Sequence, residues 1–147
     1  MYYFESIQKQ YELKQILDSW IGTPYRHWCG VKGQGADCIH FVARVFEEIG
    51  IKEKFKIERY APDWHLHNTN EKLLNGIFEQ LKVEDVGYEN PISGDVILFH
   101  FGKASSHAAV YFDGYIYQAI NGIGVQKINW NDNMWTKRRR FGLRLLV

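Results

Sequence analysis

The sequence predicts an α+β fold in which helices come first along the chain and antiparallel strands follow. In the first half, apolar residues recur at spacings of three and four, which is typical of amphipathic helices. After Asn90, short apolar runs alternate with turn sequences, and the dipeptide Asp113-Gly114 is a strong hairpin signal. Helices followed by strands in this order imply helices packed against a meandering sheet.

Three helices are expected in the first half of the chain. Asp37 is a residue type that caps helix N-termini and Gly50 is a stop signal, so these two residues bound the second helix. Thr69 or Asn70 caps the third helix. The three helices are expected at residues 5–20, 38–49 and about 70–81. The apolar stripe of the first helix consists of Ile7, Tyr11, Leu13, Ile16, Leu17 and Trp20.

Strands are expected in the second half. Val96 to Phe101 is an apolar run broken only by His100, which indicates a buried strand. The segment 135–140 is short and basic, and the cations of Lys137 to Arg140 are expected to form a solvated face. The expected strands are residues 96–101, 107–112, 115–120, 125–130 and 141–147.

The composition is that of an ordinary globular domain. The chain has 147 residues, 46% of them hydrophobic and 24% charged, so we expect one domain over residues 1–147. Aromatic residues make up 16% of the chain, and such residues line ligand grooves as well as cores. The formal net charge of +1 gives no reason to expect a nucleic acid or a membrane surface as a partner.

The first residues carry no targeting signal that we recognise. Residues 1–14 lack the apolar central region and the cleavage-site pattern of a signal peptide. No run of about 18 apolar residues occurs, so no membrane span is expected. We therefore expect the chain in the cytoplasm as synthesised, and any action outside the cell would need another factor to carry or release it.

Cys38 is the candidate nucleophile. It is expected in the first turn of a helix, where free backbone N–H groups and the helix dipole favour an anion and lower the pKa of a thiol. The alternative is that Cys38 is a small buried hydrophobe, as free cysteines in apolar helices usually are. A bridge to Cys29, the other cysteine, would block Cys38, and we expect free thiols.

A thiolate nucleophile needs a base, and six histidines are available. His40 lies two residues along the helix from Cys38, a spacing at which side chains do not face each other. His27 precedes Cys38 in a loop and could approach it. His65 and His67 could share a strand face and bind a metal, but one such pair is a weak signal, and we expect a polar surface loop.

His107 is the best-placed base among the histidines. It follows a small polar pair and begins an expected strand, which is a rigid platform for a catalytic group. Gln118 comes eleven residues later, across the hairpin, where side chains on adjacent strands meet. Its amide oxygen could accept a hydrogen bond from one imidazole nitrogen and leave the other nitrogen to face the Cys38 thiol.

Several segments, in order along nearly the whole chain, resemble the signature motifs of the NlpC/P60 cysteine peptidases. They are residues 22–25 with Trp28 and Gly30, residues 35–38, the strand segment 91–99 and the histidine segment 106–111. Two further segments, 60–64 and 135–145, resemble the branch of the family found in phage tails and gene transfer agents.

The resemblance implies a papain-like α+β fold and cleavage of amide bonds in peptidoglycan stem peptides, typically between D-glutamate and a diamino acid. It assigns Cys38 as nucleophile, His107 as base and Gln118 as the third polar residue, where the family commonly has His. Tyr25 matches a tyrosine beside the thiol that helps to hold substrate. Asp37 caps the helix or meets a substrate amine.

The resemblance implies no metal and no other cofactor. The expected partners are the peptidoglycan stem peptide and phage tail proteins, with the protein carried in the virion or released to the cell wall. Ile39 and His40 depart from the family, which often has a small pair there, and Cys29 stands where Gly is usual. These departures imply a reshaped pocket or a substrate outside peptidoglycan.

Two rival functions follow from the same residues. One is a cysteine amidase or acyltransferase that acts on an amide outside the cell wall. The other is a non-catalytic phage-tail or wall-binding module that keeps the fold.

Overall fold

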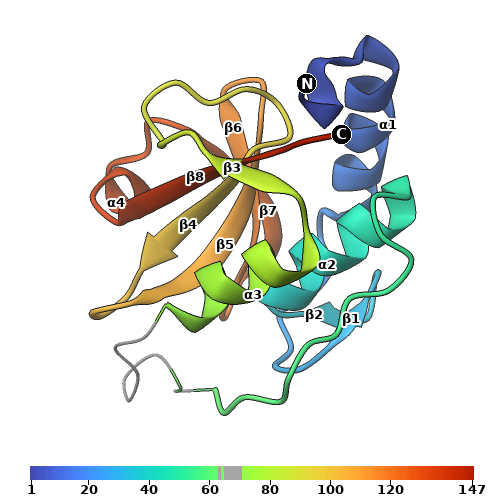
Figure 1. The fold of residues 1–147 in the computed structure, drawn as a ribbon. Coiled ribbons are helices and arrows are strands. Elements are labelled where there is room, and N and C mark those ends of the chain that lie inside the picture. Colours follow the sequence, from blue (N-terminus) through green and yellow to red (C-terminus); the bar gives the residue numbers. More distant parts are fainter. Residues whose placement is uncertain (63, 65–70) are drawn as a thin grey trace.

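The computed structural model describes residues 1–62, 64 and 71–147. Within them, the largest element is a six-stranded sheet with the strand order β3-β8-β4-β5-β6-β7. Every pair of neighbouring strands in this sheet is antiparallel. Helices dominate the first half of the chain and strands the second, so the α+β prediction is confirmed (Figure 1).

The described elements follow the expected order. The helices are η1 (Tyr3–Glu5, a 3-10 turn), α1 (Ile7–Trp20), α2 (Cys38–Ile49), α3 (Lys72–Gln80) and α4 (Asn133–Thr136). The strands of the large sheet are β3 (Val83–Asp85), β4 (Val96–His100), β5 (Ser105–Phe112), β6 (Tyr115–Ile120), β7 (Gly124–Asn129) and β8 (Arg139–Leu145). A small hairpin of β1 (Gly30–Val31) and β2 (Gly35–Ala36) precedes α2.

The predicted bounds of α2 are confirmed at both ends. The Asp37 side chain caps its first turn, and Gly50 ends it in the left-handed region with φ of 90°. The N-cap of α3 is Glu71, which makes no side-chain capping bond. The proposed caps Thr69 and Asn70, like His65 and His67, lie outside the described residues. The small elements β1, β2, β3 and α4 were not predicted, because two to four residues are too few to show a periodicity.

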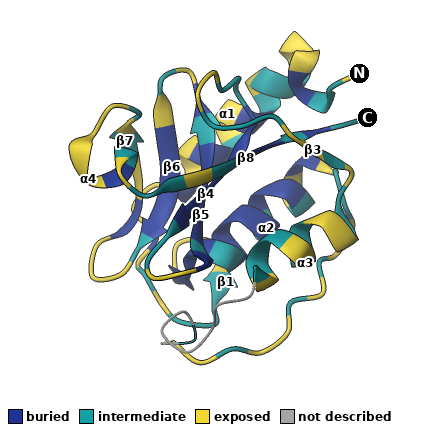
Figure 2. Cartoon of the chain, turned by 60° about the vertical axis from the view of Figure 1, so that its left-hand side comes forward, coloured by how far each residue is buried: buried dark blue, intermediate teal, exposed yellow. Residues whose placement is uncertain are grey.

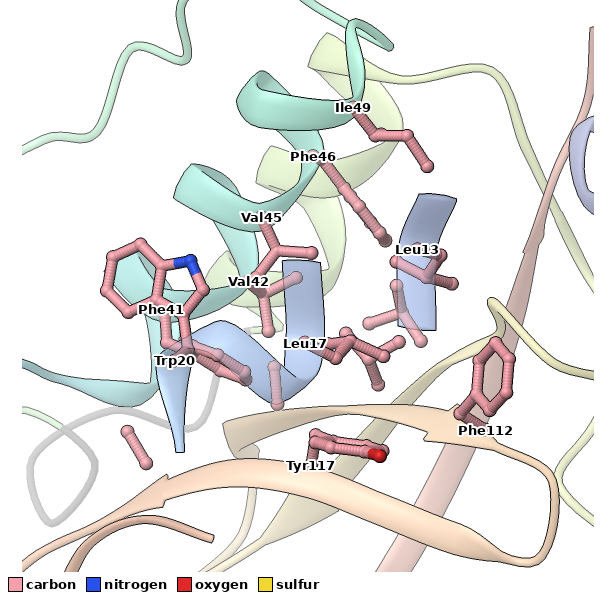
Figure 3. Close-up of a cluster of buried hydrophobic side chains, with 14 of the residues drawn as sticks. Leu13, Leu17, Trp20, Phe41, Val42, Val45, Phe46, Ile49, Phe112 and Tyr117 are labelled. Carbon is pink, nitrogen blue, oxygen red and sulfur yellow. The ribbon is translucent and has the colours of Figure 1, made fainter. Parts of the chain in front are cut away.

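The main core lies between the sheet and helices α1 and α2 (Figures 2 and 3). α1 buries Leu13, Leu17 and Trp20, which lie on one side of the helix. The predicted stripe was wrong for Ile7 and Tyr11, which are 82% and 61% exposed. Each helical residue advances by about 100°, so these two residues lie on another side of α1. Leu73, Leu74 and Ile77 of α3 pack against the edge of the same core.

A second, smaller apolar cluster lies on the opposite face of the sheet. Its buried members are Ile97, Phe99, Ala109, Ile116 and Trp135, and α4 supplies Trp135. Phe99 of β4 pairs with His107 of β5, and side chains on a strand alternate between faces. His107 therefore points to the face of this second cluster.

The pairing between β5 and β6 is confined to the hairpin end, from Val110–Tyr117 to Phe112–Tyr115. The earlier part of β5 pairs with β4 alone. α2 begins next to this part, because Cys38 Sγ lies 3.9 Å from the carbonyl oxygen of Ser106. The start of α2 thus meets the sheet where β5 and β6 part.

No helix in the described ranges has both the length and the apolar character that crossing a bilayer requires.

Candidate active site

Cys38 is the first residue of α2 and is buried. The β1–β2 hairpin and the Asp37 cap fix the backbone just before it, since Asp37 N–H donates to the Cys29 carbonyl at 3.1 Å. Cys29 and Cys38 are both free thiols, as expected. The helix start therefore presents one thiol to β5.

The expectation that the environment lowers the pKa of this thiol is wrong for the site as it is folded. Burial raises the pKa of Cys38 to about 12, and the negative charge of Asp37 adds to the rise. Backbone N–H groups of Ala108, Ile39 and Cys38 itself oppose it but do not outweigh it. The thiol is consequently protonated and neutral near pH 7.

His107 and Gln118 are joined as the sequence suggested. Nε2 of His107 lies 2.6 Å from Oε1 of Gln118, and both side chains are buried. Because an amide oxygen only accepts, Nε2 carries the proton in this contact and Nδ1 is left as the basic nitrogen. The amide nitrogen of Gln118 is buried and has no hydrogen-bond partner among the described residues. Leaving this buried amide N–H group unpaired costs about 1–3 kcal/mol of stability.

The thiol and the imidazole are neighbours through the backbone of β5. The Cys38 thiol donates to the carbonyl of Ser106, the residue before His107, and meets the N–H of Ala108, the residue after it. Among the described side chains, no hydrogen bond joins Sγ to the ring of His107 itself. Catalytic hydrogen bonds often tighten only when substrate binds, and here the thiol would have to turn from the Ser106 carbonyl to Nδ1.

Three aromatic rings surround the imidazole of His107. Trp135 stacks on it with ring centroids 5.0 Å apart, Phe101 meets it edge-on at 6.0 Å, and Phe99 lies at 5.7 Å. Burial among these rings lowers the pKa of His107 to about 4, and the hydrogen bond with Gln118 opposes the fall. The ring is therefore a neutral base over the physiological range.

Asp37 is fully engaged inside the protein. Oδ1 accepts from the backbone N–H and from Nδ1 of His40, each at 2.8 Å, and Oδ2 accepts from the N–H of Trp28 at 2.8 Å and from the hydroxyl of Tyr60. Burial alone would raise the pKa of Asp37, but the bonds from His40 and Tyr60 outweigh it and hold the pKa below its usual range. All of these contacts support its role as the helix cap.

Tyr25 lies in the segment between α1 and the β1–β2 hairpin. Its backbone bridges to Ala36, and the N–H of Ala36 donates to the Pro24 carbonyl at 2.9 Å. Burial, together with the nearby Cys38 and Asp37, raises the pKa of Tyr25 to about 12. A neutral phenol next to the nucleophile can donate a hydrogen bond to a substrate.

The sequence did not identify Tyr60 as part of the surroundings of the site. Its hydroxyl reaches Asp37 from the segment after α2, and its ring packs edge-on against Trp28 at 5.1 Å. His27, which could have approached Cys38, instead contacts the Tyr60 carbonyl through Nε2 at 3.0 Å. The segment that ends at Tyr60 is therefore tied to the residue directly before the thiol.

The basic segment 137–140 was expected to be a solvated face, and Lys137 and Arg140 are exposed while Arg138 and Arg139 are half-buried. Arg138 stacks over Phe101 at 4.5 Å, Arg139 stacks over Trp130 at 3.4 Å, and Arg140 pairs with Glu71 at 3.0 Å. Planar guanidinium groups stack on aromatic rings, and the second apolar cluster offers such rings at this edge.

In the parts of the chain that are described, no three His, Cys, Asp or Glu side chains converge as a metal site requires.

An α+β fold with a thiol at a helix start, close to a strand histidine whose ring contacts an amide oxygen, is the arrangement of thiol hydrolases, and cysteine peptidases are among them. The sequence pattern of the NlpC/P60 family matches residues 22–144, most of the chain. The chain belongs to the NlpC/P60 family.

Individual relatives agree with this family. The chain is 28% identical over 149 aligned residues to murein DD-endopeptidase MepS/murein LD-carboxypeptidase of Escherichia coli K12, an alignment that covers 97% of this chain and 69% of MepS. Among solved structures, an NLP/P60-family lipoprotein-like protein from Staphylococcus aureus Mu50 has a TM-score of 0.67 at 18% identity. That match covers 97% of this chain but only 43% of the longer chain.

The NlpC/P60 domain of the peptidoglycan hydrolase SagA is similar in fold as well, with a TM-score of 0.59 at 15% identity. Here 94% of this chain aligns with 98% of the SagA domain. At these identities the two structures establish a shared fold, and the functional argument rests on the site.

Proposed function

We propose that the chain is a peptidoglycan hydrolase that cleaves the amide bond between D-glutamate and a diamino acid in stem peptides. The observation that carries the proposal is the 2.6 Å contact of His107 Nε2 with Gln118 Oε1, because it leaves Nδ1 as a base beside the strand that meets Cys38. Family membership and the similarity to MepS, which is named as a murein endopeptidase, support peptidoglycan as the substrate.

In the proposed reaction, Nδ1 of His107 takes the thiol proton of Cys38, and the thiolate attacks the substrate carbonyl carbon. The backbone N–H of Cys38 at the start of α2 stabilises the oxyanion. His107 then donates its proton to the departing amine, and an acyl-enzyme remains on Sγ. Water, deprotonated by His107, attacks the acyl carbon, so that the free thiol and a carboxylate product form.

The two pKa values describe how this pair works. Burial disfavours the thiolate of Cys38 and the imidazolium of His107 when either is formed alone. Formed together by one proton transfer, the two opposite charges offset part of each other's desolvation cost. Deprotonation of Cys38 is therefore easiest when the proton passes directly to His107.

Two more residues complete the proposed site. Tyr25 holds the substrate next to the thiol through its neutral hydroxyl. Asp37 keeps the helix start in place, because its carboxylate already accepts from four donors. Association with a phage tail stays a prediction from the sequence segments 60–64 and 135–145.

The test is digestion of purified muropeptides with identification of the products by mass. We expect a new D-glutamyl carboxylate and a new amine on the diamino acid. Cys29→Ala, which removes the other free thiol, should keep this activity, and Cys38→Ala should lose it. Full activity in Cys38→Ala would mean that the nucleophile is misassigned.

Other product patterns separate the alternatives. DD-endopeptidase or LD-carboxypeptidase products, the reactions named for MepS, would move the cleaved bond but keep the substrate class. Failure to cut any muropeptide, with cleavage of other amide substrates that is lost in Cys38→Ala, would favour a cysteine amidase or acyltransferase outside the cell wall. If no amide substrate of either kind is cut, the non-catalytic module is the better explanation.

A further inference from the structure

His40 is a buried histidine in the first turn of α2, two residues after Cys38. Only 5% of the residue is exposed, and the reaction proposed above leaves it without a role. Its Nδ1 lies 2.8 Å from Oδ1 of Asp37. Because a carboxylate oxygen accepts and does not donate, Nδ1 carries the proton in this contact.

This bond replaces the one that commonly closes a helix start. In a capping box, the side chain of the third helical residue bonds back to the backbone N–H of the cap residue. Here the cap residue is Asp37, and its N–H already donates to the Cys29 carbonyl. The imidazole of His40, the third helical residue, instead donates to the cap carboxylate, whose Oδ1 also accepts the His40 N–H. Two of the four donors to this carboxylate therefore come from His40.

The imidazole is kept from turning away from Asp37. The Trp28 indole meets it edge-on, with ring centroids 4.6 Å apart. The backbone of β1 lies against the same side chain, because a methyl group added at Gly30 would come within 3.0 Å of the His40 Cβ atom. The Trp28 N–H donates to Oδ2 of Asp37 from a left-handed backbone conformation with φ of 53°, which is uncommon outside glycine. The imidazole and the loop before α2 thus hold one carboxylate oxygen each.

This carboxylate belongs to the residue directly before the nucleophile. The peptide group between Asp37 and Cys38 carries the N–H that the proposed reaction assigns to the oxyanion. Such a donor contributes only when it points to the place where the oxyanion forms. The bonds from His40 also help to hold the pKa of Asp37 below its usual range, so the carboxyl stays charged and can accept from all four donors.

We propose that His40 is a positioning residue that acts through Asp37 and aims the Cys38 N–H at the oxyanion. The inference rests on the proposed function and adds a residue to it. It gives a role to one of the two residues, Ile39 and His40, at which this chain departs from the small pair frequent in the family.

Two substitutions separate the hydrogen bond from the packing of the ring. His40→Asn keeps a donor, because the side-chain amide N–H of Asn can take the place of Nδ1–H, but it removes most of the ring. His40→Leu fills much of the same space and cannot donate. His100→Leu is the matched control, since it removes an imidazole at the end of β4 whose Nδ1 contacts the Gly102 carbonyl.

The measurement is steady-state cleavage of the D-glutamyl bond in purified muropeptides. In His40→Leu we expect kcat to fall about tenfold, since a misplacement of about 1 Å costs about a hundredfold and the other donors to Asp37 remain. KM should stay within about twofold, because the oxyanion exists only along the reaction and not in the bound substrate. Acylation and deacylation both form an oxyanion, so kcat falls whichever step limits the rate. His40→Asn and His100→Leu should keep kcat within about threefold of the unmodified protein.

The other outcomes decide against the inference. If kcat in His40→Asn is as low as in His40→Leu, the ring only packs, and its hydrogen bond does not aim the helix start. Full kcat in His40→Leu, or a loss confined to KM, overturns the inference as well. All of these results leave the proposed function in place. Failure of the unmodified protein to cut the D-glutamyl bond overturns the proposed function, and this inference with it.

A folding defect in His40→Leu does not leave the question open. His40→Asn then decides alone, because it lacks the ring and keeps the donor. A kcat near that of the unmodified protein supports the positioning role, and a loss of about tenfold in folded His40→Asn overturns it.

Discussion

The indole of Trp135 stacks on the imidazole of His107, with ring centroids 5.0 Å apart and planes inclined by 29°. Phe101 closes the edge of the same imidazole at an interplanar angle of 85°. Trp135 belongs to α4, a single turn that begins about twenty residues after the end of β5. The C-terminal segment therefore holds the ring of the candidate base and keeps water from it.

Trp135→Ala tests this positioning role. We expect kcat to fall about tenfold, because the imidazole loses the surface that fixes its plane. Solvent would reach the ring, so its pKa should rise from about 4 toward 6.5 and the acid limb of kcat/KM should move to higher pH. The measurement is a pH profile of muropeptide cleavage.

Trp135→Phe is the conservative companion variant. It keeps an aromatic face against His107 and should restore most of the activity and the low acid limb. If Trp135→Ala only lowered the yield of folded protein, with an unchanged acid limb, the indole would be structural packing and no more.

Gln118→Glu tests the orientation of the imidazole. A carboxylate in place of the amide still accepts from Nε2, but its charge stabilises the imidazolium and raises the pKa of His107. Because catalysis needs the neutral base, the acid limb of kcat/KM should move to higher pH by at least one unit. Gln126→Glu adds the same charge at an exposed position opposite Gln118 on β7 and should shift the limb much less.

The stability of the fold should depend on pH through His107. Its pKa is lowered from 6.5 to about 4, so the unfolded chain binds the proton more readily. The free energy of unfolding should fall as the pH drops from about 6.5 to 4, by about 3 kcal/mol in total. Urea unfolding at several pH values measures this free energy. His107→Gln should not show the fall between about pH 6.5 and 4.

At alkaline pH the sign is reversed for Cys38. Its pKa is raised from 9.0 to about 12, so stability should be lost as the pH rises through this window. In Cys38→Ser, the free energy of unfolding should change less as the pH rises through this window. An identical slope in both proteins would mean that the thiol is not buried as the structure has it.

Tyr60→Phe tests the tie between the segment after α2 and the cap of the helix. The Tyr60 hydroxyl donates to the Asp37 carboxylate, and hydrogen bonds to charged groups contribute about 1.5–3 kcal/mol. We expect a loss of about 2 kcal/mol in urea unfolding. Tyr11→Phe removes a hydroxyl from an exposed side chain of α1 and should change stability by less than about 0.5 kcal/mol.

Much of the fold could be predicted because its signals are local. The Asp37 cap, the Gly50 stop and the apolar spacing between them lie within a few turns of one helix, and all agree with α2. The Asp113-Gly114 hairpin is equally local and sets the pairing of β5 with β6. The stripe of α1 was wrong for Ile7 and Tyr11, because these residues lie on another side of the helix from the buried Leu13, Leu17 and Trp20.

The sequence by itself determined the order of helices and strands and singled out Cys38, His107 and Gln118, since capping, turn chemistry and motif spacing involve only near neighbours. Only the tertiary structure decided that the thiol turns to the Ser106 carbonyl and that the imidazole lies under Trp135. These features depend on burial and on contacts between segments far apart in the chain. For that reason the pKa of Cys38 is raised, although its place at a helix start suggested the opposite.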